Sequence, residues 1–529
     1  MSTELSFARK ASGLTRGIST RDLFALSVMY IQPCWGIFFA TVYGLLLFPR
    51  GNLLIALGLS FVTVGVFGPL MWGMLSGTMP RSGGEYVFNS RILSAPVALA
   101  ASAAAFLGGL CLSFFPCLVM TRSLQSISAV MGWDGAALWF GSRYAPLLVG
   151  GIGLLLAFLV VTFGMRVFNL IQWPLLILGI GAPLLWIFTL LSTSQTGLIE
   201  SWNEYAAQNH TLDYQSFLGA VETTIGGTLP QTWNWHDTFG LTGSMALLLI
   251  SYVVVYVGGE VKRPERSTLI AGWSSIAVSA AIAAGVFAAL YHTVGYRMLA
   301  AGAVNYVLGL QPHPNGSAVN LAAIAAHGNR AVSVVTSLAF LLTSFWLMAV
   351  MLIVLSRTMF AWGMDRMGPK WFTSVNPRTA TPVWNFVTYL VLTLIGLVIY
   401  QTWIPTMSLF VGVAVFLIGV YLVTGVSALA LPYRRKTRDI WNSSPYRGWK
   451  IAGIPVICIA GVVWMLYTGV LLYYQFFDPQ VRPSVGGFKQ IYFLVGCGVL
   501  GVLWYLFWAW RSRKVGVDVR FQYRQLPPE

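Results

Sequence analysis

Residues 27–46 read SVMYIQPCWGIFFATVYGLL, a stretch apolar enough to lie within a membrane. Gln32, Pro33 and Gly36 stand near its middle, where a spanning helix needs the most regular hydrogen bonding. Proline removes a backbone donor and clashes with the preceding turn, and glycine weakens the helix further. Irregular backbone at membrane depth is tolerated only when it is buried in protein or lines a cavity. The stretch therefore predicts either a helix interrupted around a binding site or a proline kink that neighbouring helices satisfy, and taken alone it favours neither.

The rest of the chain shares this apolar character. Of its 529 residues, 57% are hydrophobic and only 9% are charged, whereas a soluble protein carries about 25% charged residues. Apolar runs near the ~20 residues that cross a hydrocarbon core recur from end to end. We expect an all-α integral membrane protein with about twelve transmembrane helices rather than a β-barrel. The expected spans are 22–47, 52–78, 93–120, 145–164, 168–191, 239–260, 268–296, 331–356, 382–402, 404–431, 451–476 and 490–510.

The net charge of +16 is distributed unevenly along these spans. With the N-terminus placed in the cytoplasm, the inner loops and both tails hold 25 of the 32 Lys and Arg residues. This positive-inside bias predicts that both termini are cytoplasmic, in a multi-pass protein of the cytoplasmic membrane. The basic runs are therefore topology determinants, and we expect the lipid bilayer but no nucleic acid as a partner.

The sequence predicts one membrane domain rather than several soluble ones. A cytoplasmic tail over 1–21 precedes a transporter domain over 22–510, and a second tail covers 511–529. Within the domain we expect two repeats of inverted topology, 22–191 and 239–431, followed by two extra helices over 451–510.

Metal and catalytic sites are not expected. The five cysteines all fall within spans and form no CxxC pair or metal-ligand cluster. Paired carboxylates, a His cluster or a Ser/His arrangement at membrane depth would be needed for an enzyme, and the spans show none of these. We expect no cofactor, except for a proton or sodium ion that drives transport.

Several segments carry a family resemblance. The stretch MPRSGGEYVFNSRIL (79–93) resembles the signature that follows the second helix of amino acid–polyamine–organocation (APC) permeases, through Pro80, Ser82, Gly83, Gly84, Glu85 and Tyr86. The stretch GGEVKRPERS (258–267) resembles the end of the family's sixth helix, through Glu260, Lys262 and Pro264. The loop after the eighth helix is similar through Ser356, Arg357, Asp365, Pro369, Pro377 and Pro382. The later stretches LALPYRRK and IAGIPVICIAGV resemble some bacterial and archaeal members, so we expect a prokaryotic source.

This resemblance implies the LeuT-type fold, a five-plus-five inverted repeat in which helices 1 and 6 are unwound around a central substrate site. The chain departs from the family in both helices. Cys34 and Trp35 replace part of the usual Gly-Ser-Gly-Ile-Phe motif of helix 1. The centre of helix 6, LLLISYVVVY (247–256), contains no glycine, so whether helix 6 is broken stays open.

We expect a secondary active transporter of amino acids that works by alternating access. Charged side chains are absent from the middle of the expected spans, which favours a neutral, zwitterionic amino acid held by helix ends. The predicted substrate-binding residues are Gln32, Pro33, Cys34, Trp35, Gly36, Phe106, Ile250, Ser251 and Tyr252. Gln32 either orients the substrate or caps the carbonyls that Pro33 leaves free.

The coupling mechanism stays open between proton symport, sodium symport and exchange. Ile31, Thr343 and Ser344 are predicted ligands for sodium, although hydroxyl groups within a helix more often bond to their own backbone. Glu85, Glu260 and Arg357 are predicted to form either an inner gate or static anchors at the interface. The alternatives are a transporter of another amine or nucleobase-like solute, and a membrane sensor that does not transport; the oligomeric state is not predicted.

Overall fold

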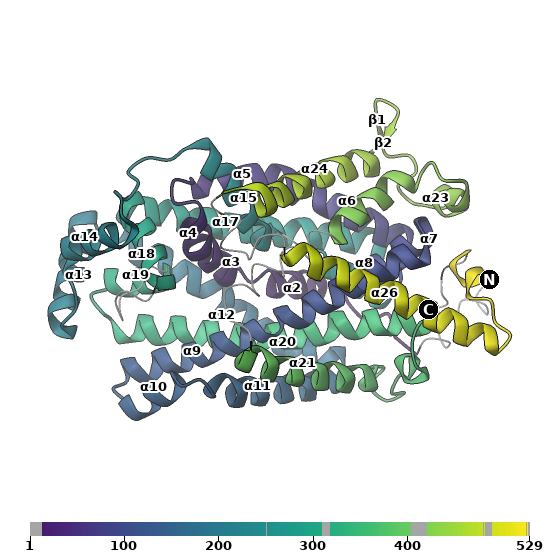
Figure 1. Ribbon diagram of the computed structural model, residues 1–529, viewed down its shortest axis with the longest axis horizontal. Helices are drawn as coiled ribbons and strands as arrows, with labels where there is room; N and C mark the ends of the chain where they lie inside the picture. The colour runs from purple at the N-terminus through teal and green to yellow at the C-terminus, as the bar shows by residue number, and fades with distance from the viewer. Residues whose placement is uncertain are drawn as a thin grey trace.

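A computed structural model describes residues 13–249, 251–308, 318–403, 420–479, 481, 489–524 and 526. The described chain is a bundle of long helices, most of which run along the longest axis of the molecule (Figure 1). Within these ranges, ten helical segments are long and apolar enough to cross a membrane. They are Thr20–Leu47, Leu53–Thr78, Ala95–Val130, Ala145–Thr162, Met165–Leu191, Pro264–Thr293, Arg330–Met364, Val383–Thr402, Val456–Phe477 and Ile491–Lys514. The prediction of an all-α membrane protein is confirmed.

The first half of the bundle contains the first five spans. Its elements are α2 (Thr20–Ile31), α3 (Pro33–Phe39), η1 (Ala40–Gly44), α4 (Leu45–Leu47), α5 (Leu53–Ser60), η2 (Phe61–Gly65), α6 (Val66–Thr78), α7 (Glu85–Ile92), α8 (Ala95–Leu112), α9 (Phe114–Val130), α10 (Asp134–Phe140), α11 (Ala145–Thr162) and α12 (Met165–Leu191). Two further helices, α13 (Gln195–Asn209) and α14 (Tyr214–Ile225), follow between the fifth span and α15.

The second half repeats the pattern of long helices. Its elements are α15 (Trp235–Leu249), α16 (Val253–Tyr256), η3 (Gly258–Glu260), α17 (Pro264–Thr293), α18 (Tyr296–Leu308), α19 (Ala318–Ala325), α20 (Arg330–Met364), η4 (Lys370–Thr373), α21 (Val383–Trp403), η5 (Arg435–Thr437), α23 (Arg438–Asn442), α24 (Val456–Phe477), α26 (Lys489–Lys514) and η6 (Val519–Arg524). A short antiparallel hairpin, β1 (Lys450–Ile451) and β2 (Ile454–Pro455), precedes α24.

Two predicted spans differ from the others. The span predicted over 239–260 is divided between α15 and α16, so that neither piece is long enough to cross a membrane by itself. Most of the span predicted over 404–431 lies outside the described residues, and its described part is an apolar helix over Val420–Ala430.

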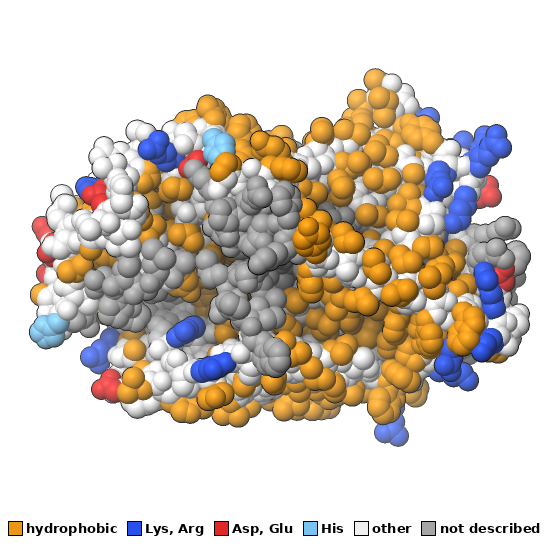
Figure 2. Space-filling view, viewed as in Figure 1, with side chains coloured by type: hydrophobic (Ala, Val, Ile, Leu, Met, Phe, Trp, Pro, Cys, Tyr) orange, Lys and Arg blue, Asp and Glu red, His pale blue; other side chains and the backbone are white. Residues whose placement is uncertain are grey.

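The surface separates into an apolar band and a basic end. Hydrophobic side chains cover the middle of the molecule, and Lys and Arg gather at one end, at the right of Figure 2. The band includes strongly exposed apolar residues such as Leu170 and Ile177 on α12, which are 74% and 71% exposed. Exposed apolar side chains in such numbers are typical of a surface that faces lipid. The loop before α23 and the end of α26 both lie at what we call the basic end.

Helix α20 lies at the centre of the bundle and positions the site. It packs against α2, α9, α11, α12 and α21. In its most apolar stretch of 18 residues, 78% of the residues are buried. Because α2 also packs against α12 and α17, the predicted break in helix 1 is enclosed by α12 and α20.

Candidate functional site

Helix 1 is interrupted at Gln32. The backbone of Gln32 is left-handed, with φ 49° and ψ 82°. The Gln32 N–H donates to the carbonyl of Val28, which is the last hydrogen bond of α2. Pro33 then begins α3, and the N–H groups of Trp35 and Gly36 donate to the Gln32 carbonyl at 2.9 and 3.1 Å. A non-glycine residue in this conformation costs roughly 1–2 kcal/mol, so the surrounding contacts must hold it. The predicted interruption of helix 1 is confirmed.

Helix 6 is also interrupted, although its centre contains no glycine. Helix α15 ends at Leu249 and α16 begins at Val253, with Ser251 outside both. The two broken helices meet at Gly36, where an added Cβ would lie 2.4 Å from Cδ2 of Leu248. A side chain at position 36 would therefore separate helices 1 and 6.

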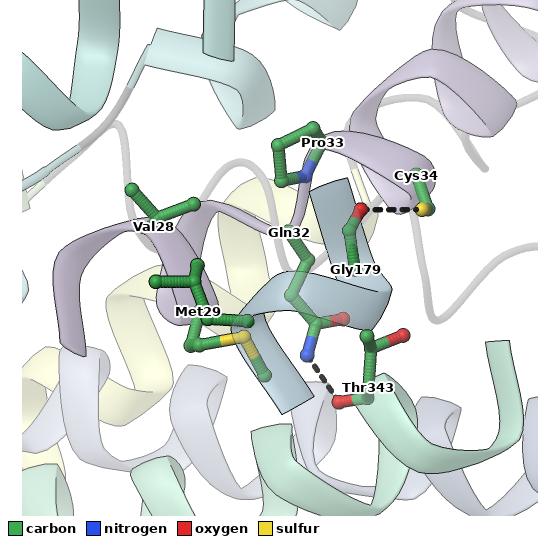
Figure 3. Close-up of a pocket in the computed structure, with 8 residues that line it drawn as sticks. Val28, Met29, Gln32, Pro33, Cys34, Gly179 and Thr343 are labelled. Carbon is green, nitrogen blue, oxygen red and sulfur yellow. Dashed lines mark hydrogen bonds between the residues drawn. The ribbon is translucent and has the colours of Figure 1, made fainter. Parts of the chain in front are cut away.

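A small cavity lies beside the break in helix 1 (Figure 3). Its lining comes from α2, α3, α12 and α20, through Val28, Met29, Gln32, Pro33, Cys34, Leu176, Gly179 and Thr343. Only about 10 Å³ is open to the centre of a water-sized sphere, which is room for about one water molecule. None of these eight described lining residues carries a charge.

Gln32 is the main polar side chain of this cavity. It is 3% exposed, and its Nε2 donates to the carbonyl of Thr343 on α20 (Figure 3). Its Oε1 is buried and finds no hydrogen-bond partner within the described part of the chain. An unsatisfied buried acceptor costs about 1–3 kcal/mol, so this oxygen is poised for a donor that enters the cavity. Cys34 makes a further contact across the cavity, from Sγ to the carbonyl of Gly179 at 3.3 Å.

The hydroxyl groups predicted to bind sodium are both engaged. Thr343 Oγ1 donates to the carbonyl of Ala339 in its own helix at 2.7 Å. Ser344 Oγ accepts from the indole Nε1 of Trp35 at 3.1 Å. Trp35 also packs against Phe115, with ring centroids 4.4 Å apart. The structure thus brings these predicted residues together, with Ile31 at the end of α2.

Tyr252 belongs to an aromatic cluster that the sequence alone did not indicate. Its hydroxyl is hydrogen-bonded to that of Tyr30 on α2, and its ring lies 4.9 Å from Tyr421 and 6.0 Å from Trp72, centroid to centroid. Aromatic residues make up 14% of the chain, so no single aromatic residue stands out as part of a site without its neighbours in space.

Two other predicted residues, Ser251 and Phe106, lie apart from this cavity. Ser251 points toward α17, where its Oγ lies 3.3 Å from the position of a Cβ added at Gly272. Phe106 packs against Trp362, with ring centroids 5.4 Å apart. Trp362 is nineteen residues beyond Thr343 on α20, which is about 28 Å along a helix. Ile250 lies outside the described residues.

The predicted gate residues lie at the basic end, and two of the three are paired. Arg357 donates to both carboxylate oxygens of Glu260, from Nε at 2.9 Å and from Nη2 at 3.0 Å. Both side chains are almost fully buried, at 0% and 3% exposed. We call this pair the inner ion pair. Glu85 lies outside it, within hydrogen-bonding reach of Tyr256.

Two further contacts close the basic end. Ile18, just before α2, pairs with Val261 as a parallel bridge; its N–H donates to the carbonyl of Glu260, and its carbonyl accepts from the N–H of Lys262, at 3.0 and 3.1 Å. A second buried ion pair joins Arg91 on α7 to Asp365 after α20, with Nη2 2.6 Å from Oδ1. The segments before helix 1, after helix 6 and after α20 are therefore all fixed in this conformation.

A comparison with known families adds to this geometry. The family model described as amino acid permease matches residues 18–501. The chain belongs to the amino acid permease family. No curated protein sequence shows significant similarity to it. Membership makes the chain an integral membrane transporter of a family that moves amino acids, and it confirms the resemblance that the motifs indicated.

Proposed function

We propose that this permease carries neutral amino acids across the cytoplasmic membrane by alternating access. The observation that carries the proposal is the break at Gln32, a residue that lines an uncharged cavity and whose buried Oε1 has no partner among the described residues. An α-ammonium group is a donor that satisfies such an acceptor, and a hydrogen bond to a charged group contributes about 1.5–3 kcal/mol. A substrate side chain of either charge would meet no countercharge among the eight lining residues.

The interrupted helices supply the rest of the recognition chemistry. Pro33 has no N–H to offer to the carbonyl of Met29 four residues earlier, so this carbonyl keeps a free lone pair near the cavity. Helix α2 ends and α3 begins at this point, so partial negative and partial positive charge lie on its two sides. Such a pair of helix ends matches the ammonium and carboxylate groups that every free amino acid carries.

The conformation described is closed at the cavity and at the basic end. The cavity has room for about one water molecule, so a substrate enters only when α2 and α3 move relative to α12 and α20. The gathering of Lys and Arg residues at the basic end supports, by the positive-inside rule, a cytoplasmic position for this end and for both described ends of the chain. We infer that the inner ion pair, Glu260 with Arg357, is the cytoplasmic gate.

Sodium coupling is not favoured at the predicted ligands. The amide of Gln32 donates to the Thr343 carbonyl, so this carbonyl oxygen of α20, beside the break, is already used. The Thr343 and Ser344 hydroxyls are also used within the protein. An N–H donor thus stands where a hard cation would collect oxygen ligands. This arrangement favours proton symport or exchange.

Uptake into proteoliposomes tests the proposal. Labelled neutral amino acids are supplied with an inward proton gradient, an inward sodium gradient or unlabelled amino acid preloaded inside. The Gln32→Ala variant should raise the substrate KM by about ten- to one-hundred-fold, which corresponds to the ~1.5–3 kcal/mol of a hydrogen bond to a charged group. Gln172→Ala is the matched control, because Gln172 is equally buried but donates to the carbonyl of Asp22, away from the cavity.

Two results would overturn the proposal. An unchanged KM in Gln32→Ala, with folded protein, would remove Gln32 from the substrate site. Binding of a neutral amino acid without uptake or exchange would make the protein a sensor rather than a transporter.

A further inference from the structure

Glu85 is a buried carboxyl that the proposed recognition site does not use. It begins α7 at the basic end, and the residue is only 1% exposed. The preceding turn is held against helix 6, because the N–H of Gly83 donates to the carbonyl of Tyr256 at 3.1 Å and Ser82 pairs with Val257. Gly84 has φ +59°, and a Cβ there would lie 2.9 Å from the Tyr256 ring. The glycines of the family motif thus allow the Glu85 backbone to approach helix 6 closely.

The two carboxyl oxygens of Glu85 lie in different surroundings. The Tyr256 hydroxyl forms a hydrogen bond to the carboxyl group. Oε1 is fully buried and has no partner in the described chain. The two buried arginines nearby are already used, Arg357 by Glu260 and Arg91 by Asp365. A buried carboxylate without a cation is costly in its charged form. Burial accordingly raises the pKa of Glu85 to about 7, although the hydrogen bond from Tyr256 acts in the opposite direction.

The titratable groups that interact directly with the Glu85 carboxyl are phenols. Tyr30 on α2 and Tyr252 and Tyr256 on helix 6 all interact electrostatically with its carboxyl. The elements packed around α7 carry further titratable groups. These are Arg81 just before α7, Tyr86 and Arg91 on α7, Cys111 on α8, Arg357 on α20, Asp365 just after α20, Tyr523 on η6, and Arg435 and Lys436 on η5. Arg435 and Lys436 are exposed, and the side chains of Tyr86 and Tyr523 are hydrogen-bonded to each other at 3.2 Å.

The phenols connect Glu85 with the break in helix 1. The ring of Tyr256 lies 6.0 Å from that of Tyr252, centroid to centroid, and the Tyr252 hydroxyl is bonded to that of Tyr30. Tyr30 stands two residues before Gln32 in the same helix. The phenol side chains of Tyr30, Tyr252 and Tyr256 therefore lead from the turn of helix 1 before Gln32 to the buried carboxyl of Glu85.

We propose that Glu85 is the group that binds and releases the coupling proton of this permease. This inference rests on the proposed function and specifies its driving ion. When the outer side is open, hydronium delivers a proton that forms an O–H bond on Glu85, and one water molecule remains. When the inner side opens, the proton leaves to cytoplasmic water, and the carboxylate remains hydrated until the site closes again. No other bond changes, and no electron is transferred.

The closed inner end explains why this proton is coupled to movement. While Glu260 and Arg357 are paired and Ile18 is bound to helix 6, Glu85 is dehydrated and its neutral form is favoured. Separation of helix 6 from the turn over 82–84 admits water and lowers the free-energy cost of ionising the Glu85 carboxyl. Protonation of Glu85 therefore favours the closed inner end, and its ionisation favours the open one.

The test compares Glu85→Gln with the parent protein. Glutamine keeps the size of the side chain and a hydrogen-bonding oxygen but does not titrate near neutral pH. We expect Glu85→Gln to retain exchange of internal for external amino acid and to lose accumulation driven by a proton gradient, together with the alkalinisation that accompanies uptake. The matched control is Glu265→Gln, at an exposed carboxyl in the first turn of α17 at the same end, which should behave like the parent.

A second readout does not depend on transport. Infrared difference spectra of the parent in lipid, recorded across neutral pH, should show the C=O band of a protonated carboxyl that titrates near pH 7. Glu85→Gln should lack this band and Glu265→Gln should keep it. Absence of the band from the parent, or proton-driven accumulation by Glu85→Gln, would overturn the inference. If the band is present but no amino acid is transported or exchanged, the proposed function fails while Glu85 remains a proton site.

Discussion

Breaking the inner ion pair should open the cytoplasmic side. Arg357→Met removes the guanidinium but keeps an unbranched apolar side chain in place of the arginine stem, and it leaves the Glu260 carboxylate buried without a cation. Removing one partner of a buried pair costs about 3–5 kcal/mol. Opening the inner end hydrates this carboxylate and relieves the cost. If all of the cost acts on the closed form, the ratio of closed to open protein falls by roughly one hundred to several thousand, at about 1.4 kcal/mol per factor of ten.

Cys34 reports this opening. Its side chain lines the cavity and is 1% exposed in the closed form. In a background that lacks Cys111, Cys117, Cys458 and Cys497, an impermeant maleimide is applied to the cytoplasmic face of inside-out vesicles. The rate of Cys34 labelling should rise strongly in Arg357→Met. Arg297→Met is the control, because Arg297 pairs with Glu222 where both side chains are partly exposed, at 39% and 22%.

Adding Glu260→Gln to Arg357→Met separates a gate from a simple anchor. The double variant has no orphaned charge, and replacing both partners of a buried pair is often neutral. Its labelling rate should fall most of the way back toward the parent rate. A single variant that melts normally and labels at the parent rate would refute the gate. A double variant that labels as fast as the single variant would show that the unpaired charge is not the cause.

Two further substitutions test the contacts between elements. Gly36→Ala places a Cβ 2.4 Å from Cδ2 of Leu248, and overpacking of this kind costs about 1–3 kcal/mol. The melting temperature in detergent should therefore fall and the substrate KM should rise. A variant with parental values would show that helices 1 and 6 separate freely. At the outer end, hydrogen bonds from the N–H of Leu229 and from Arg297 lower the pKa of Glu222 below its ordinary value of 4.5. Its contribution to stability is therefore complete above pH 4.5 and is lost as the pH falls through the lower folded pKa, a loss that melting curves should show for the parent but not for Glu222→Gln.

The sequence was sufficient for the spans and for the first break. A hydrocarbon core dictates the length and composition of each spanning helix, so hydropathy located the ten spans that the described residues contain. Pro33 indicated an irregularity near Gln32, because it cannot donate the bond that a continuous helix requires. The stretch alone left a proline kink open, and the family resemblance favoured the break.

The break in helix 6 depends on contacts that no single stretch reveals. The segment LLLISYVVVY contains neither glycine nor proline. Its interruption accompanies the close approach of Gly36 to Leu248 and the hydrogen bond between Tyr252 and Tyr30, which are contacts between distant parts of the chain. The position of Phe106 away from the cavity was not predictable for a related reason: hydropathy places a residue within a span but does not give its depth relative to another helix.

The inner half of helix 6 links the proposed substrate site to the proposed cytoplasmic gate. Helix α16 has only four residues, and helices this short are not stable by themselves. It is held instead by the turn over 82–84, through the bond from Gly83 to Tyr256, and the segment after it is held by Ile18. Its position therefore depends on a few contacts that can be exchanged, rather than on a continuous helix. Because Tyr252 adjoins the break in helix 1 and Glu260 carries the inner ion pair, a movement of this one segment changes the site and the gate together.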